Sequence, residues 1–106
     1  RSRKSGHEMA RVDMAPEVLD DFDRILDFQI QNQVANAAAR ITEIVHAIDV
    51  LAHNPLIGRP VLNGKRELVI GRKGRGFLAL YQYVDKLDTV YILAVRSQRE
   101  AGYTRP

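Results

Sequence analysis

Apolar residues recur with a helical period in the first half of this chain and with a period of two in much of the second half. Between positions 18 and 30 they are spaced by three and four, with aspartates between them; they are Val18, Leu19, Phe22, Ile25, Leu26 and Ile30. This spacing predicts an amphipathic helix. Pro16 suits the first turn of that helix, where a backbone N–H would have no partner in any case.

A second helix is predicted from about residue 34 to residue 53. Its apolar stripe consists of Ile41, Ile44, Val45, Ile48 and Leu51. Asn54 and Pro55 end it, because a residue that precedes proline disfavours helical geometry. Only a few polar residues around 31–33 separate the two helices, so we expect a tight antiparallel helical hairpin.

Strands are predicted on both sides of the hairpin. A short one covers Arg11 to Met14, and three more cover residues 66–71, 76–84 and 89–95. In 76–84 every second residue shares a face, whereas 89–95 is apolar at nearly every position, as in a central strand. The predicted fold class is α+β, in the order β-α-α-β-β-β, with the helical hairpin packed on a mostly antiparallel four-stranded sheet.

The length of 106 residues fits one domain. We assign residues 9–106 to it and interpret residues 1–8, which are polar and without a period, as a flexible tail or a remnant of cloning. The chain contains no cysteine, so disulfides and thiolate chemistry are excluded. No apolar run approaches the roughly 20 residues of a membrane span. A cytoplasmic protein without a membrane partner is therefore expected.

The formal charge of +3 conceals an asymmetry between the two halves. Residues 9–54 contain 3 basic and 8 acidic side chains, whereas residues 55–106 contain 10 basic and 4 acidic ones. A basic half of this kind can bind an anion, either a nucleic acid or an acidic protein surface. A solvated rim without a ligand remains the alternative.

Other chemistry has little support in the sequence. The three histidines are His7, His46 and His53, and no cysteine joins them, so neither a metal site nor a cofactor is predicted. The aspartates at 20, 21, 23 and 27 are interpreted as a solvated helix face. Glycines 71, 74 and 76 join two strands rather than opening a helix, so a phosphate-binding loop is not predicted.

The basic residues offer the best candidates for a binding surface. Those that flank the first hairpin of the sheet or follow its last strand are Arg66, Arg72, Lys73, Arg75, Arg96 and Arg99. Arginine side chains placed on one surface can hold phosphates through paired hydrogen bonds. In a metal-free ribonuclease such cations would stabilise the transition state, and lysine, arginine or tyrosine would have to transfer protons.

Four stretches in the second half, taken in order, resemble the RelE/ParE superfamily of bacterial toxins. They are Asn-Pro-Leu-Ile-Gly-Arg-Pro at 54–60, Arg-Glu-Leu-Val-Ile-Gly at 66–71, Leu-Tyr-Gln-Tyr at 80–83 and Ile-Leu-Ala-Val-Arg-Ser-Gln-Arg-Glu at 92–100. The resemblance covers Met9 to Tyr103 and agrees with the predicted order of elements.

The resemblance implies the toxin of a type II toxin–antitoxin pair, of the kind often named plasmid stabilisation proteins. Such a toxin inhibits growth until a cognate antitoxin wraps around it, and the two form a hetero-oligomer. Operator DNA is then contacted only through the antitoxin. ParE-like members poison DNA gyrase and so block replication, whereas RelE-like members cut messenger RNA on the ribosome. A third reading is a remnant that binds an antitoxin and has lost its toxicity.

Several positions favour the ParE-like branch. Leu78 stands where the nuclease pattern has an arginine, and Arg66 and Glu67 replace a pair of lysines. The resemblance therefore implies a gyrase poison rather than an enzyme, with target contacts at Arg72, Lys73, Arg75, Arg96 and Arg99. If the chain is instead a metal-independent endoribonuclease, the catalytic residues implied are Arg66, Arg99 and Tyr103. The helical hairpin and exposed apolar positions of the sheet are the expected antitoxin contacts.

Overall fold

The computed structural model describes residues 9–32, 35–72, 75–100 and 102–103. Its elements follow the order predicted from the sequence, with one short strand added. They are β1 (Arg11–Met14), α1 (Glu17–Gln31), α2 (Ala37–Val50), β2 (Arg59–Pro60), β3 (Arg66–Ile70), β4 (Phe77–Val84) and β5 (Thr89–Ser97). Two single 3₁₀ turns, Leu62–Gly64 and Asp85–Leu87, lie between strands.

The strands form one mixed sheet in the order β1-β5-β4-β3-β2. β1 runs parallel to β5, and the remaining pairs are antiparallel. The α+β class and the order of the main elements are thus confirmed, but the sheet has five strands rather than four. β2 was missed because it contains only two residues, one of them a proline, and neither its length nor its composition is typical of a strand.

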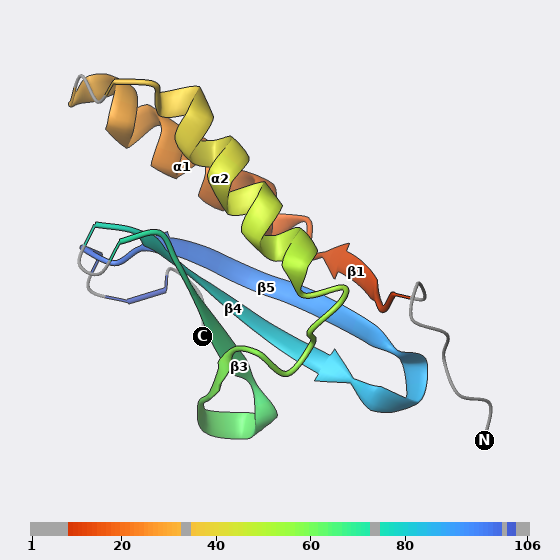
Figure 1. Cartoon of the computed structure of the whole chain (residues 1–106). Helices are drawn as coiled ribbons and strands as arrows, with labels where there is room; N and C mark the ends of the chain where they lie inside the picture. The colour runs from red at the N-terminus through yellow and green to blue at the C-terminus, as the bar shows by residue number, and fades with distance from the viewer. Residues whose placement is uncertain (1–8, 33–34, 73–74, 101, 104–106) are drawn as a thin grey trace.

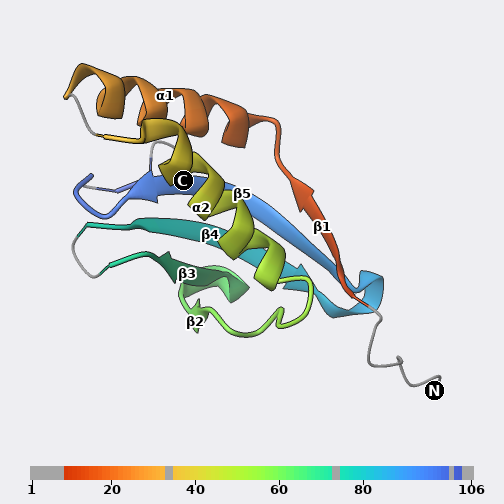
Figure 2. The ribbon, with the colours of Figure 1, turned by 45° about the horizontal axis from the view of Figure 1, so that its top comes forward.

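The two helices form an antiparallel hairpin that covers one face of the sheet (Figures 1 and 2). α1 packs mainly on β5, and α2 reaches toward β3. α2 is shorter than predicted: it begins at Ala37 after Asn36, which has the left-handed φ of 58°, and ends at Val50. The predicted start at residue 34 lies outside the described residues. Turns replace the predicted last helical residues, 51–53.

The core lies between the hairpin and the covered face of the sheet. Its buried members come from both helices, the turn after α2 and the three longest strands; among them are Val18, Ile25, Ile44, Ile48, Leu51, Ile70, Phe77, Ala79, Tyr81, Val90, Ile92 and Val95. A β-bulge in the β4–β5 pairing, between Leu80 and Tyr81, shifts the register there. No helix in the described part of the chain is long and apolar enough to cross a membrane.

Two members of the predicted apolar stripe of α1 are not in this core. Leu19 is 63% exposed and Ile30 is 59% exposed. The face of α1 that packs on the sheet instead passes through Val18, Asp21, Ile25 and Gln29. The apolar pattern of α1 is therefore wider than the surface that β5 covers.

Candidate functional site

The face of the sheet that the helices leave open carries a polar network centred on Glu67. Leu68 and Ile70 of β3 pack toward the core, so strand alternation places Glu67 on the opposite face. Glu67 is nevertheless only 6% exposed. Its carboxylate accepts hydrogen bonds from the Tyr103 hydroxyl, at 2.5 Å, and from the Arg59 guanidinium, at 2.5 and 3.1 Å.

Arg96 holds the other side of Tyr103. It lies opposite Leu78 in the β4–β5 register, and its guanidinium carbon is 5.0 Å from the centroid of the Tyr103 ring. The same guanidinium donates to the backbone oxygens of Ser97 and Glu100. These contacts bring the segment after β5 back over the open face. A cation above an aromatic ring is attracted by the ring's negative face, which helps to fix Tyr103 there.

The network changes the protonation of its two acidic groups. Burial opposes the charge of Glu67, but hydrogen bonds from Tyr103 and Arg59, together with the positive charges of Arg59 and Arg96, lower its pKa below the usual value. For Tyr103 the pKa is raised, chiefly by burial and then by the hydrogen bond to Glu67 and its negative charge. Tyr103 therefore stays protonated at neutral pH, and its hydroxyl donates a hydrogen bond to the Glu67 carboxylate.

The three residues implied for ribonuclease catalysis do not meet in this structure. Arg66 shares the covered face with Leu68, and its guanidinium donates to the backbone oxygens of Leu56, at 3.1 Å, and Gly58, at 2.7 Å. Tyr103 lies on the open face. Arg99 lies beyond β5, in a pocket on the helix side. Arg66 thus has a structural role in holding the loop before β2.

The contacts of that same loop explain why the sequence has glycine at position 58. The Gly58 N–H donates to the buried hydroxyl of Tyr81 at 2.8 Å. A Cβ at position 58 would lie 2.7 Å from the Tyr81 ring and 2.9 Å from the backbone oxygen of Glu67, which is too close for any side chain. Gly58 and Tyr81 therefore belong together, and they fix the loop against β3 and β4.

On the covered side, the interpretation of the aspartates as a solvated face is wrong for Asp21. This residue is 1% exposed, and its carboxylate accepts hydrogen bonds from the Val95 N–H, at 3.0 Å, and from Arg24, at 2.8 Å. Arg24 also donates to the Val95 backbone oxygen and to the Glu100 carboxylate. Burial is tolerated because both charges are paired and hydrogen-bonded. Asp20, Asp23 and Asp27 are exposed, as expected.

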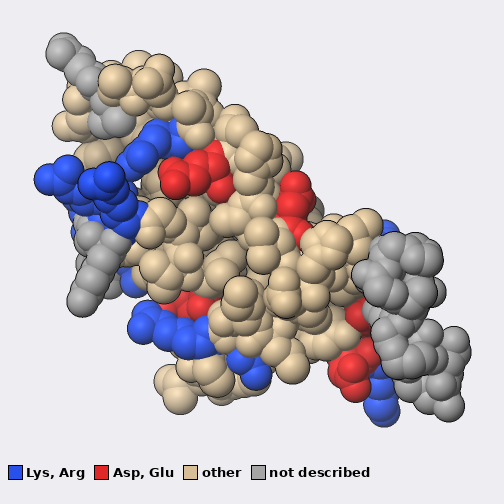
Figure 3. Space-filling view, in the orientation of Figure 1, with Lys and Arg blue, Asp and Glu red and all other residues tan. Residues whose placement is uncertain are grey.

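The predicted target contacts fall into two groups. Arg72 and Arg75 flank the β3–β4 turn and are exposed, Arg99 is exposed beyond β5, and Lys73 lies outside the described residues. Figure 3 shows lysine and arginine side chains gathered at this end of the molecule. Arg96 is separate from them, because it faces the open side of the sheet with Tyr103. The structure thus brings Arg75 and Arg99 together, at one pocket, and not the whole set.

Sequence reasoning missed several residues at these sites: Asp21, Arg24, Gln29, Arg40 and Arg59. One signal was available, since Asp21 and Arg24 are three apart on a helix and Asp21 continues the spacing of Val18 and Ile25. No such local signal marked Arg59 as the partner of Glu67. His46 and His53 are both exposed, and within the described ranges no group of three or more potential ligands could hold a metal ion.

Comparisons with known proteins agree with this architecture. The chain is similar to a chain of the chromosomal ParDE toxin–antitoxin system from P. aeruginosa, with 22% identity, a TM-score of 0.70 and coverage of 88% of this chain and 98% of that one. It is also similar to a chain of the RelBE2 toxin–antitoxin complex from M. tuberculosis, with 19% identity, a TM-score of 0.59 and coverage of 89% and 97%.

A third similar structure is a double arginine-to-alanine mutant of the toxin RelE from E. coli in its free state. It has 13% identity and a TM-score of 0.59, with coverage of 86% of this chain and 85% of that one. These likenesses concern the fold. A comparison with curated protein sequences gives no significant match.

The family evidence comes from the sequence. The family described as "ParE toxin of type II toxin-antitoxin system, parDE" matches residues 12–102. The match extends from β1 through the segment that carries Arg96 and Arg99, so it includes both helices and all five strands. The chain therefore belongs to the ParE toxin family of type II toxin–antitoxin systems.

Proposed function

We propose that this toxin inhibits DNA gyrase and thereby blocks replication, and that a cognate antitoxin neutralises it. The observation that carries the proposal is the state of the open face. A nuclease site on this face would need cations without carboxylate partners and a group that can accept a proton from the substrate at neutral pH. Instead Glu67 pairs with Arg59 and accepts a hydrogen bond from the Tyr103 hydroxyl, and buried Leu78 adds no charge.

The surface proposed for target contact is the end of the sheet around the β3–β4 turn. Arg72 and Arg75 are exposed there, and no ion pair of either side chain is found among the described residues. Exposed guanidinium groups without carboxylate partners can pair with acidic side chains or phosphates of a target. Gyrase holding cleaved DNA would present both kinds of anion. Arg99 adds a third such group nearby.

The antitoxin is proposed to cover apolar side chains that the fold leaves in water. On α1 these include Leu19 and Ile30, and in the loops around β2 they include Leu56, Ile57 and Leu62, all more than half exposed. Large exposed apolar groups on a small protein indicate an interaction surface. An amphipathic helix or an extended segment of a partner could bury them. The complex would then be a hetero-oligomer.

The experiment is a DNA-cleavage assay with purified gyrase and supercoiled plasmid. We expect the toxin to accumulate linear DNA, and the Arg72→Ala/Arg75→Ala variant to accumulate much less at the same toxin concentration. Lys86→Ala is the matched control, because it removes an exposed positive charge from the β4–β5 turn instead. Equal cleavage by both variants would show that the β3–β4 turn is not the contact.

Induction in cells separates the alternatives. DNA breaks with an SOS response agree with gyrase inhibition. Growth arrest with intact DNA and cut messenger RNA would replace the proposal by a ribosome-dependent endoribonuclease, and Tyr103→Phe would then be the first variant to measure. Soluble expression without arrest would identify a remnant that only binds its antitoxin.

A further inference from the structure

A pocket of about 370 Å³ lies between the second half of α1, the first turn of α2, the start of β4 and the end of β5. Both helices and both strands contribute to it, together with the segment after β5. It is on the helix side of the sheet and is separate from the network of Glu67 and Tyr103. A volume of this size is in the range of small-ligand sites.

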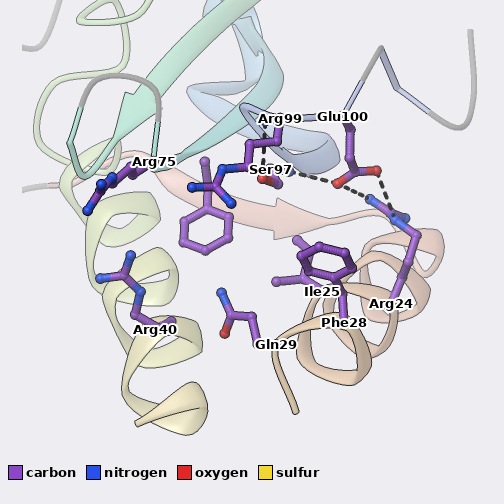
Figure 4. A pocket seen from close by; sticks show the side chains of 10 residues that line it. Arg24, Ile25, Phe28, Gln29, Arg40, Arg75, Ser97, Arg99 and Glu100 are labelled. Atoms are coloured by element: carbon purple, nitrogen blue, oxygen red, sulfur yellow. Dashed lines mark hydrogen bonds and ion pairs between the residues drawn. The ribbon is translucent and has the colours of Figure 1, made fainter. Parts of the chain in front are cut away.

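The charges around the pocket are unequal. Four arginines line it, Arg24, Arg40, Arg75 and Arg99, and the acidic residue among its lining side chains is Glu100. Glu100 is already engaged, because its carboxylate accepts hydrogen bonds from Arg24 and from the Ser97 N–H. Figure 4 shows Arg40 and Arg75 on the other side of the pocket from this pair, with the Arg99 side chain between the two sides. Their combined field favours an anion.

The three arginines are available to a ligand. Arg40 is 3.7 Å from Glu43, an exposed pair of modest strength, and its Nε is buried without a hydrogen-bond partner. Arg75 and Arg99 are exposed, and no ion pair of their side chains is found within the described segments. An anion placed among them would therefore not have to break a strong existing interaction.

The walls between the arginines are apolar and contain one unsatisfied amide. Ile25 and Phe77 are buried, whereas the ring of Phe28 is 54% exposed beside the pocket. Gln29 is 7% exposed, and its Oε1 is buried without a hydrogen-bond partner. Figure 4 shows Gln29 between Arg40 and Phe28. Because this oxygen has almost no accessible surface, a ligand in the pocket would meet the apolar walls and not the amide oxygen.

We propose that this pocket binds a nucleotide. The phosphate would pair with Arg75 and Arg99, and the base would stack on Phe28. Inorganic phosphate alone would leave the apolar walls uncovered. A neutral aromatic compound would leave the arginines unpaired. A nucleotide combines an anion and a flat ring in one molecule.

The test uses AMP as the probe, in calorimetric titrations of the purified chain at low and moderate salt. We expect saturable binding of AMP that weakens as salt increases, and weaker binding of adenosine and of inorganic phosphate. This assay needs neither gyrase nor toxicity, so its failure is distinguishable from failure of the proposed function.

Variants locate the site. Arg99→Ala and Arg75→Ala should each lower AMP affinity by about tenfold or more, since a hydrogen bond between charged groups is lost. Phe28→Ala should also weaken AMP binding, because the base then loses the ring on which it stacks. Lys86→Ala, far from the pocket, should leave affinity unchanged. Thermal unfolding of each variant establishes that it is folded.

Three results would overturn the proposal. One is the absence of saturable AMP binding at millimolar concentration. Another is AMP binding that none of the pocket variants weakens. The third is binding of a short peptide that contains aspartate and phenylalanine, lost in Arg99→Ala, by a chain that does not bind AMP; that result would assign the pocket to an acidic protein partner.

Discussion

The two faces of the sheet both carry arginines, but they differ in what surrounds them. On the open face, Glu67 is hydrogen-bonded to Arg59 and Tyr103, and Arg96 lies over the Tyr103 ring. On the covered face, at the end of the hairpin, Arg40, Arg75 and Arg99 outnumber the carboxylates that could pair with them. Net positive charge in a sequence therefore does not locate a binding surface; the positions of the few acidic residues do.

The largest effect is expected on the covered face, from Asp21→Ala. The change leaves the buried Val95 N–H without an acceptor and Arg24 without one of its two carboxylates. Loss of one partner from a buried pair costs about 3–5 kcal/mol in free energy of unfolding. Urea unfolding measures it. The neighbouring Asp20→Ala is the matched control and should stay within about 0.5 kcal/mol of the parent, since Asp20 is exposed.

A loss of under about 1 kcal/mol in Asp21→Ala would contradict this account of the covered face. It would mean that Val95 and Arg24 find other partners, and that the helix is attached to β5 by apolar packing alone.

A smaller effect is expected on the open face, from Glu67→Gln. The change removes the charge that Tyr103 and Arg59 share, and we expect a loss of about 1–2 kcal/mol at pH 7, less than a fully buried pair because Arg59 is largely exposed. The native pKa of Glu67 is lowered, so its stabilisation is present above the ordinary glutamate value of 4.5 and disappears as the pH falls through the lower native value.

Thermal unfolding between pH 7 and pH 3 measures this dependence. The parent should lose stability below about pH 4.5 more steeply than Glu67→Gln does. Glu17→Gln, an exposed change of the same kind on α1, should follow the parent. Identical pH profiles for the parent and Glu67→Gln would show that the open-face network does not stabilise the fold.

The smallest effect is expected from Arg75→Ala, and its sign distinguishes the two faces. Removal of one of several like charges relieves repulsion, so stability should be unchanged or higher by up to about 0.5 kcal/mol, with the gain greatest at low salt. Arg59→Ala on the open face should lower stability, because Glu67 then loses a partner. Denaturant unfolding at two salt concentrations compares them. A clear loss of stability in Arg75→Ala would reveal a carboxylate partner at the pocket.

Much of the fold was predictable because it depends on local patterns. The helical spacing from Val18 to Ile30 and the two-residue alternation from Phe77 to Val84 predicted α1 and β4, whereas α2 ends at Val50, three residues before the end that Pro55 predicted. The exception was β2, which exists only because Arg59 and Pro60 pair with Glu67 and Arg66. A strand of two residues is recognised by its pairing with β3 and leaves no periodic pattern in the sequence.

The sites were less predictable, because their partners are distant in the sequence. Asp21 and Val95 are separated by 74 positions, and the acidic pattern around Asp21 is equally consistent with an exposed face. Likewise, the pocket joins residues of α1, α2, β4 and the segment after β5. The basic residues could be picked out of the sequence as a group, but only the fold determines which of them lie near Glu67 and which line the pocket.

The pairing of the first strand with the last has a consequence for synthesis of the chain. β1 is held in the sheet by its parallel pairing with β5, with Arg11 opposite Thr89. While a ribosome is still making the chain, the helical hairpin can form, but the central strand that it covers is missing, and long-range pairing of this kind is slow. We expect the end of the molecule that carries Arg75 and Arg99 to assemble only once β5 has been synthesised and has left the ribosome. The surface proposed for target contact would therefore form only after β5 has been synthesised.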